Sequence, residues 1–281
     1  MRSPEERGRV MTSVTGADIR AGFERLGLIG KRVVVHSSLR SFGNVIGGVD
    51  TVVTEMINSF ETILVPAFCW DSNAPPPPHD RPEQNGCDYS FYEGWTKPLK
   101  PFIVESAGIE PKMGIISRKF VSLPLSRRSA HAWHSWVAWG SMAEQLVENH
   151  SWETTNLPLE RLANLDGQLL LMGVGLSSCT AIHIAEERAG RRPFIRWATD
   201  RNGEVKRVRA AGCAKGFDKL IPYCCRELFS ETYVGDCRIL STPLEPFIEH
   251  MVKVISSHRE LTPCSDTCLR CRDVLLGGPL V

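Results

Sequence analysis

The segment 128–136 places imidazole and hydroxyl side chains close together, in the order Arg-Ser-Ala-His-Ala-Trp-His-Ser-Trp. An imidazole titrates near neutral pH and can take a proton from an attacking nucleophile, so His131 and His134 are both candidates for a general base. A lone histidine is more often structural than catalytic. The segment therefore suggests proton transfer but needs partners elsewhere in the chain before it indicates a reaction.

A second group of titratable side chains lies at 180–187, which reads Thr-Ala-Ile-His-Ile-Ala-Glu-Glu. On a helix, His183 lies beside Glu186 and shares a face with Glu187, which are three and four residues further on. A carboxylate held against an imidazole fixes the tautomer of the ring and stabilises the imidazolium formed on proton uptake. The alternative is a solvated helix face without a catalytic role.

A third pattern is a β-branched run, Val33–His36, that ends in hydroxyl residues. Ser37 and Ser38 follow directly, and Gly47-Gly48 precede the next helical pattern. A loop of this kind exposes backbone N–H groups and the positive end of a helix dipole, which suits the phosphates or the amide-rich arm of a coenzyme. Ordinary turn chemistry accounts for serine and glycine after a strand at least as well.

Ten cysteines are spread along the chain, and several cluster near its end. Thiolates at this spacing suit tetrahedral Zn²⁺, and a short tail would gain stability from such a site. The expected ligands are Cys224, Cys225, Cys268 and Cys271, with Cys264 or Cys237 as substitutes. Unrelated thiols are an equal alternative. Cys69 and Cys179 are separate candidates for a nucleophile, because each follows or precedes an expected element end.

The elements that must position these side chains are read from periodicity. Helices are expected at 18–28, 51–60, 142–149, 180–189, 217–229 and 244–256, and strands at 33–36, 62–66, 126–140 and 168–174, with a hairpin over 195–208. Thr15 or Asp18 is the expected N-cap of the first helix. The Pro- and aromatic-rich region 69–101 is expected to be a long ordered loop. No linker interrupts the chain, so residues 1–281 are expected to form one α/β domain with a core over about 18–256 and a Cys-bearing tail at 264–281.

Charge and hydropathy exclude several partners. The chain has 33 Lys and Arg against 32 Asp and Glu, a net charge of +1, which gives no field that favours nucleic acid or an anionic membrane. No apolar run reaches the length of a membrane span, and the polar N-terminus has no export-signal core. A cytoplasmic protein with reduced thiols is expected, whereas the oligomeric state is not predicted.

Taken together and in this order, the three patterns resemble the aminoglycoside N3-acetyltransferase family. Further segments resemble it as well, namely 64–68, 112–116 and 169–175. The resemblance implies acetyl-CoA as cosubstrate and supports a three-layer α/β/α domain, for which a mainly parallel central sheet is expected. The residues that match the coenzyme-binding segments are Ser37, Ser38, Leu39, Ile46, Gly47, Gly48, Arg128 and Ser129.

The same resemblance assigns roles around the reaction. His131 matches the family's His in Arg-Ser-x-His-Pro and is the expected general base, with Glu186 as the carboxylate that orients it. Expected acceptor contacts are Asp71, His134, His183 and Glu187, because carboxylates attract a polycationic antibiotic. Ser38 and Ser135 are candidates for the oxyanion hole. Ala132 stands where the family has Pro, which loosens the backbone next to His131.

The expected activity is direct acetyl transfer from acetyl-CoA to the 3-amino group of a 2-deoxystreptamine aminoglycoside, which would confer antibiotic resistance. Three alternatives stay open: the same transfer to another amine in a biosynthetic pathway, a zinc-stabilised binding module without catalysis, and a Cys-dependent hydrolase. The first requires an amine acceptor, the second predicts no turnover, and the third requires a thiol nucleophile.

Overall fold

A seven-stranded β-sheet forms the centre of the computed structural model, which describes residues 13–224 and 226–280. The strand order is β3-β4-β2-β1-β5-β9-β8. The three central strands, β1 (Arg32–Ser37), β2 (Thr62–Pro66) and β5 (Gln168–Met172), run parallel. Their Val-, Ile- and Leu-rich runs are buried on both faces, as their sequences predicted.

The outer strands make the sheet mixed rather than mainly parallel, so that part of the expected fold class is wrong. On one side, β4 (Trp136–Gly140) runs antiparallel to β2, and the short β3 (Arg127–Arg128) antiparallel to β4. On the other side, β9 (Cys237–Pro243) runs antiparallel to both β5 and β8 (Ser230–Val234). The links β3–β4 and β8–β9 contain no crossover helix, so these neighbours can pair only in antiparallel fashion.

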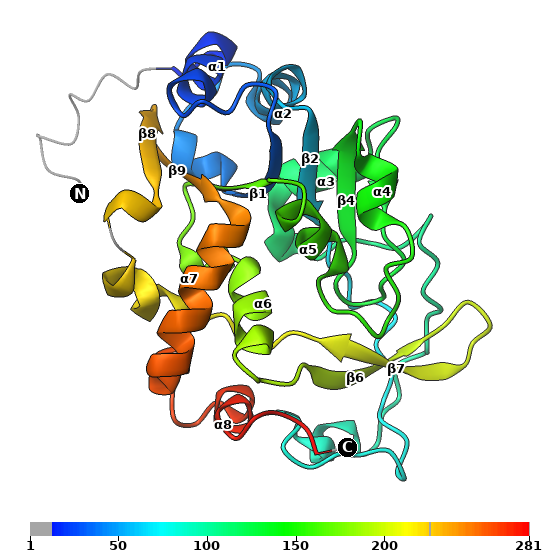
Figure 1. Cartoon of the computed structure of the whole chain (residues 1–281). Helices are drawn as coiled ribbons and strands as arrows, with labels where there is room; N and C mark the ends of the chain where they lie inside the picture. Colours follow the sequence, from blue (N-terminus) through cyan, green and yellow to red (C-terminus); the bar gives the residue numbers. More distant parts are fainter. Residues whose placement is uncertain (1–12, 225, 281) are drawn as a thin grey trace, which may run out of the picture.

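Helices cover both faces of the sheet and complete an α/β fold with three layers (Figure 1). One face packs against α1 (Gly16–Arg25), α2 (Gly48–Ser59) and α3 (Gly114–Val121). The other face packs against α4 (Ala143–Val147), α5 (Leu157–Ala163), α6 (Ala181–Arg188) and α7 (Leu244–Ser257). Val33 and Val35 lie in the first core and Val34 in the second, which is the alternation expected along a strand.

Local signals explain where several elements begin and end. The Thr15 side chain caps α1 by accepting a hydrogen bond from the Asp18 amide, and the Asp18 carboxylate accepts the Thr15 amide in return. The region 217–229 is not the expected α-helix but two 3₁₀ segments, Phe217–Tyr223 and Arg226–Leu228. Pro222 lies inside the first of them and lacks the N–H that an α-helix would need.

The expected strand over 126–140 is divided, and the division matters for the site. Between β3 and β4 the chain leaves the sheet over residues 129–135, and His131 and His134 both lie in this connection. It is referred to below as the histidine turn.

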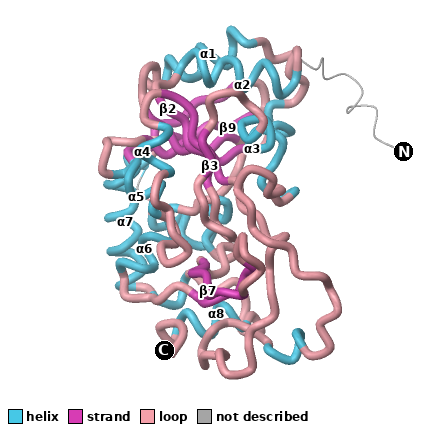
Figure 2. Tube along the Cα trace, turned by 90° about the vertical axis from the view of Figure 1, so that its right-hand side faces the viewer, coloured by secondary structure: helices cyan, strands magenta, loops and turns pink. Residues whose placement is uncertain are grey.

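A separate hairpin, β6 (Phe194–Thr199) with β7 (Val205–Ala210), lies away from the central sheet. Its turn contains Asn202-Gly203, with Gly203 at φ 86°, as the sequence predicted. Figures 1 and 2 agree that the hairpin and α8 (Leu269–Leu275) lie together at one end of the molecule. Cys264 and Cys268 precede α8, and Cys271 lies within it.

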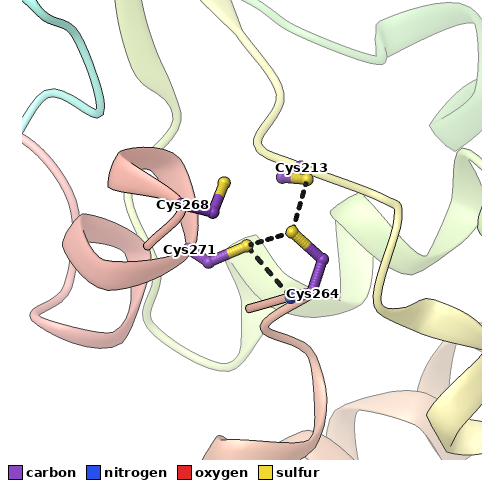
Figure 3. A group of neighbouring side chains, drawn as sticks. All are labelled: Cys213, Cys264, Cys268 and Cys271. Atoms are coloured by element: carbon purple, nitrogen blue, oxygen red, sulfur yellow. Dashed lines mark hydrogen bonds between the residues drawn. The ribbon is translucent and has the colours of Figure 1, made fainter. Parts of the chain in front are cut away.

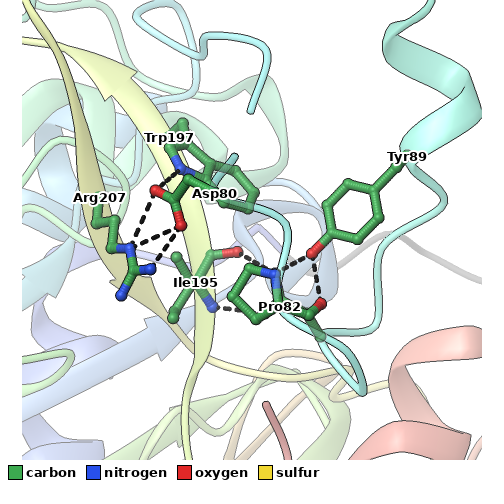
Figure 4. Close-up of polar contacts among 7 residues, drawn as sticks. Asp80, Pro82, Tyr89, Ile195, Trp197 and Arg207 are labelled. Atoms are coloured by element: carbon green, nitrogen blue, oxygen red, sulfur yellow. Dashed lines mark hydrogen bonds and ion pairs between the residues drawn. The ribbon is translucent and has the colours of Figure 1, made fainter. Parts of the chain in front are cut away.

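The region 69–101 is a long ordered loop, as expected, and it is fastened to this hairpin (Figure 4). The Asp80 carboxylate accepts hydrogen bonds from Arg207 at 2.6 and 2.9 Å and from the Trp197 indole at 2.8 Å. The Tyr89 hydroxyl donates to the Pro82 carbonyl at 2.7 Å.

Among the described residues, no helix combines the length and apolar character needed to cross a bilayer.

Candidate active site

The centre of the candidate site is a row of three charged or titratable side chains that begins on α6. His183 Nδ1 lies 2.8 Å from Glu186 Oε2, and the other carboxylate oxygen, Oε1, accepts a hydrogen bond from Arg191 at 2.6 Å. The Glu186 and Arg191 side chains are only 6% and 2% exposed. The guanidinium compensates the buried carboxylate, which in turn leaves Nε2 of His183 as the ring nitrogen available to other groups.

His183 lines a cavity of about 450 Å³, a volume in the range of small-molecule sites. The cavity lies beside the end of β1, the residues that follow β2 and the start of α6. Its wall includes His36, Ser37, Phe68, Trp133, His134 and Thr180. Residues 211–215, which directly follow β7, form another part of the wall and are called the cavity strip below.

Two other imidazoles on this wall are held neutral. Burial lowers the pKa of His36 to about 4. Burial, with smaller electrostatic contributions from neighbouring basic side chains, lowers the pKa of His134 to about 3. His134 Nε2 accepts a hydrogen bond from the Ala211 amide at 3.2 Å, which joins the histidine turn to the cavity strip. A neutral imidazole with that nitrogen already engaged is better placed to shape the acceptor side of the cavity than to take up a proton.

His131, the residue expected to be the base, does not line this cavity. Its side chain is 0% exposed, and its Nδ1 accepts hydrogen bonds from the amides of Trp133 and His134 at 3.1 and 2.9 Å. Burial lowers its pKa well below the usual value. The ring packs against that of His150, with centroids 4.8 Å apart and planes tilted by 32°, and thus holds the histidine turn in shape. His131 is thus enclosed by protein, whereas His183 lines the cavity.

The residues expected to bind coenzyme fall into two groups. Ser37 lines the cavity, with Ser38 and Leu39 directly after it at the end of β1. Gly47 and Gly48 adopt positive φ at the start of α2, and the Ile46 side chain beside them is 57% exposed. A second cavity, of about 650 Å³, shares Val174 with the first. Ile46, Gly47 and Gly48 line neither of these two cavities.

Arg128 and Ser129 are engaged elsewhere, so the structure does not support their expected contact with coenzyme. The Arg128 guanidinium donates to the carbonyls of Ala67, Ala107 and Gly108. The Ser129 hydroxyl is buried and accepts the Trp136 amide at 2.8 Å. Ser135 is likewise buried and donates to the Ala67 carbonyl at 2.6 Å, which removes it from the oxyanion-hole candidates. These bonds shape the histidine turn.

The expected acidic contacts do not meet in the main cavity. Asp71 is exposed near Gly108 and is not part of the wall. Glu187 faces a small neighbouring hollow with His183 and Glu186, and burial, with repulsion from Glu160 and Glu186, raises its pKa to about 7. The charged side chains of the main wall are instead Lys112, Lys215 and Arg270.

The structure revises the expected metal ligands. Cys268 and Cys271 do lie together, but their partners are Cys264, named above as a substitute, and Cys213 (Figure 3). Cys224 lies apart, with its thiol 3.6 Å from the Leu220 carbonyl, and Cys225 lies outside the described residues. The candidates for a nucleophile, Cys69 and Cys179, are both buried, and burial raises the pKa of each thiol.

Sequence reasoning missed Arg191, the cavity strip and Cys213. Arg191 stands five residues after Glu186 and beyond the end of α6, so the i, i+3 and i, i+4 spacings of a helix do not predict their contact. The strip Ala-Gly-Cys-Ala-Lys carries no motif, although a glycine after a strand end is a signal for close backbone approach. A Cβ added to Gly212 would lie 3.9 Å from Glu186 Oε2, so the backbone of the strip does lie close over the carboxylate.

Comparison with known proteins agrees with this architecture. The family model for aminoglycoside 3-N-acetyltransferase matches residues 34–256. Aminoglycoside N(3)-acetyltransferase III of Salmonella sp is 36% identical over 188 residues, which cover 63% of this chain and 63% of that protein. The chain thus spans somewhat less than two thirds of the length of such curated relatives.

Solved structures resemble the whole fold. The apoenzyme of the aminoglycoside acetyltransferase AAC(3)-IVa matches with a TM-score of 0.76 at 21% identity, covering 96% of this chain and 99% of that one. AAC(3)-IIb matches with a TM-score of 0.70 at 25% identity, covering 89% and 98%. Because the family model spans the sheet, the histidine turn and α6, the chain belongs to the aminoglycoside 3-N-acetyltransferase family.

Proposed function

We propose that this chain transfers the acetyl group of acetyl-CoA to an amine, and that the amine is the 3-amino group of a 2-deoxystreptamine aminoglycoside. The observation that carries the proposal is the row His183–Glu186–Arg191, whose first member lines a cavity of about 450 Å³. The relatives add support: AAC-IIIb has been solved with CoASH and AAC(3)-IVa with a gentamicin.

The proposed base is His183. An ammonium cannot attack a thioester, so the acceptor would enter as the neutral amine, its first proton having gone to solvent. As the amine nitrogen bonds to the thioester carbon and the C–S bond breaks, Nε2 of His183 would take the second N–H proton while Nδ1 donates to Glu186. The imidazolium so formed lies against a carboxylate whose own charge is balanced by Arg191, so proton uptake creates no isolated buried charge. The proton then passes to the sulfur of the departing thiolate, which restores the neutral ring.

The coenzyme would supply the activated acetyl group. Ser37 and Ser38 at the end of β1, with Ile46, Gly47 and Gly48 before α2, are the residues proposed to bind its arm. Of these residues Ser37 lines the main cavity, and Val174 lines both that cavity and the second one. Thr180 lines the same wall one turn before His183 and is the hydroxyl we assign to the thioester carbonyl oxygen.

A second candidate is favoured by the charge of the wall. Lys112, Lys215 and Arg270 line the main cavity, whereas no Asp or Glu is among its described lining residues. Such a wall suits the phosphates of the coenzyme, or an acceptor amine that itself carries an anionic group, better than a polycationic sugar. The same chemistry on an anionic amine is therefore the alternative acceptor.

A thiol-release assay with acetyl-CoA separates these possibilities. Kanamycin-type and gentamicin-type acceptors would be compared with simple amines and with amines that carry a carboxylate or phosphate. Turnover confined to aminoglycosides supports the first proposal, and turnover confined to anionic amines supports the second. No release with any amine, together with no thermal shift on adding acetyl-CoA, would overturn both in favour of a non-catalytic binding module.

A further inference from the structure

Four cysteine side chains from distant parts of the chain meet next to the cavity strip. Their sulfur atoms, those of Cys213, Cys264, Cys268 and Cys271, all lie within 4.8 Å of one another. Figure 3 shows Cys213 approaching from the strand side, with the other three around the start of α8. We propose that this cluster is a structural Zn²⁺ site and that the metal holds the cavity strip against His183 and Glu186.

The spacing of the sulfur atoms fits a metal better than disulfides. Cys264 Sγ lies 3.7 Å from Cys213 Sγ and 3.5 Å from Cys271 Sγ, far beyond a disulfide bond of about 2.05 Å. A tetrahedron with Zn–S bonds of about 2.3 Å has edges of about 3.8 Å between sulfurs. These two separations are close to the edge length of a ZnS₄ tetrahedron, and the remaining sulfur pairs lie within 4.8 Å.

The chemistry of the donors selects the metal. Four sulfur ligands in tetrahedral order are typical of zinc or of an iron–sulfur centre, and hard oxygen-seeking cations such as Mg²⁺ are excluded. The Cys264 amide also points at Cys271 Sγ, at 3.2 Å, and such an N–H donor stabilises thiolate charge. Binding would convert four thiols to thiolates and release their protons to solvent. With all four positions filled by protein, the metal has no open site for substrate.

The position of Cys213 gives the metal a role in the active site. Cys213 belongs to the cavity strip, residues 211–215, every one of which lines the main cavity. On one side of it Ala211 donates to His134, and Gly212 lies close over Glu186. A bond from Cys213 to the metal would thus fix the strip at its middle residue, between the histidine turn and the segment that leads to α8.

A second connection runs from the cluster toward the same carboxylate. Arg191, which binds Glu186, also donates to the Thr262 hydroxyl at 2.6 Å and to the Arg259 carbonyl at 2.8 Å. Thr262 stands two residues before Cys264. The metal would therefore stabilise both the backbone that covers Glu186 and the segment that supports Arg191.

Metal analysis tests the site without reference to activity. Wild-type protein purified in chelator-free buffer should contain about one zinc per chain by elemental mass spectrometry, and a mercurial reagent should release it as four thiols react. Less than about one zinc per several chains, iron in its place, or a loss of thiols that only a reductant reverses would overturn the proposal.

Matched variants test the ligands. Cys268→Ala should lose zinc, Cys268→His should retain it because imidazole is also a zinc ligand, and Cys87→Ser, outside the cluster, should match wild type. Equal zinc in Cys268→Ala and wild type would exclude this ligand set. If Cys268→Ala does not fold, the wild-type metal content and the Cys268→His result still decide the question.

Hydrogen exchange tests the positioning role. Removing zinc from the wild type with a chelator should raise exchange at the amides of the cavity strip at least tenfold, while amides of β1 and β2 stay protected. The kinetic form of the test rests on the proposed acetyl transfer: the acceptor KM should rise at least tenfold. Unchanged exchange in the strip after metal loss would overturn the positioning role even if zinc is bound.

Discussion

The Nδ1 atom of His183 and the Oε2 atom of Glu186 lie 2.8 Å apart within one turn of α6, at the border of the main cavity. This contact makes His183, rather than His131, the imidazole that is both oriented and able to reach a substrate. In His131 the Nδ1 atom instead accepts hydrogen bonds from two backbone amides, those of Trp133 and His134, and faces no carboxylate among the described residues. The two histidines can therefore be distinguished by the same substitution.

We expect His183→Asn to lower kcat by about 10²- to 10⁴-fold, the usual contribution of a general base. The matched variant His131→Asn keeps an acceptor for the amides of Trp133 and His134, so it should retain most turnover and lose mainly stability. Steady-state kinetics and thermal unfolding of both proteins measure the difference. A catalytic loss confined to His131→Asn would return the role of base to that residue.

Glu186 should have a catalytic role and a structural role that can be separated. Glu186→Gln leaves Arg191 buried without its counter-charge, which should lower the free energy of unfolding by about 3–5 kcal/mol and also lower kcat. Replacing both members, in Glu186→Gln with Arg191→Met, should recover part of the stability and none of the kcat. Chemical denaturation and initial rates test this. Recovery of kcat with stability would mean that Glu186 acts through folding alone.

Parts of the fold were predictable because their signals are local. The run Thr62–Pro66 is a strand with the bounds that its sequence indicated, and the Thr15 cap and the Asn202-Gly203 turn are set by neighbouring residues. In α6 the i, i+3 spacing of His183 and Glu186 on a helix is enough to predict their contact. In each case a few consecutive residues decide the outcome.

The rest depends on contacts between distant segments. Cys213 meets Cys264 across 51 residues, whereas the adjacent pair Cys224-Cys225 looked more like ligands on the sequence alone. On the sequence alone His131 and His134 were the candidates for a base, and His183 was an expected acceptor contact. Only packing encloses His131 and places His183 at the cavity. The antiparallel outer strands arise in the same way, since the direction of β4 beside β2 is set by the path of the intervening chain.

Stability should fall in acid because several histidines are buried in the neutral form. Burial lowers the pKa of His36 to about 4, of His134 to about 3 and of His150 to about 4, from an ordinary value of 6.5. The unfolded chain binds more protons than the folded one between those values. Each group therefore lowers the free energy of unfolding by roughly 1.4 kcal/mol per pH unit as the pH falls from about 6.5 toward the pKa of that group in the folded chain.

Urea midpoints between pH 4.5 and 7.5 measure this dependence. His150→Gln should reduce the loss of unfolding free energy per pH unit by the contribution of one histidine. His79→Gln, at an exposed position, should leave that loss unchanged. An acid slope that is identical in wild type and His150→Gln would contradict the assignment.

Glu187 should have the opposite dependence on pH. Burial, with repulsion from Glu160 and Glu186, raises the pKa of its carboxyl group from 4.5 to about 7. The folded protein then binds the extra proton between these values, so this residue's contribution to stability is present below about pH 4.5 and is lost as the pH rises to about 7. The cost at pH 8 is at most about 3 kcal/mol.

Glu187→Gln keeps the shape of the side chain and cannot ionise, so it should unfold at a higher temperature than wild type at pH 8 and at the same temperature at pH 4.5. Glu249→Gln, an exposed carboxylate on α7, is the matched control and should follow wild type at both pH values.

Because the buried histidines titrate over nearly the same pH range with the opposite sign, the pH dependence of wild-type stability alone shows only the difference between the two effects. The two substitutions resolve it: His150→Gln should flatten the acid loss, and Glu187→Gln should steepen the net rise of stability with pH between about 4.5 and 7. A Glu187→Gln protein that gains nothing at pH 8 would show that this carboxylate is ionised without penalty in the folded chain.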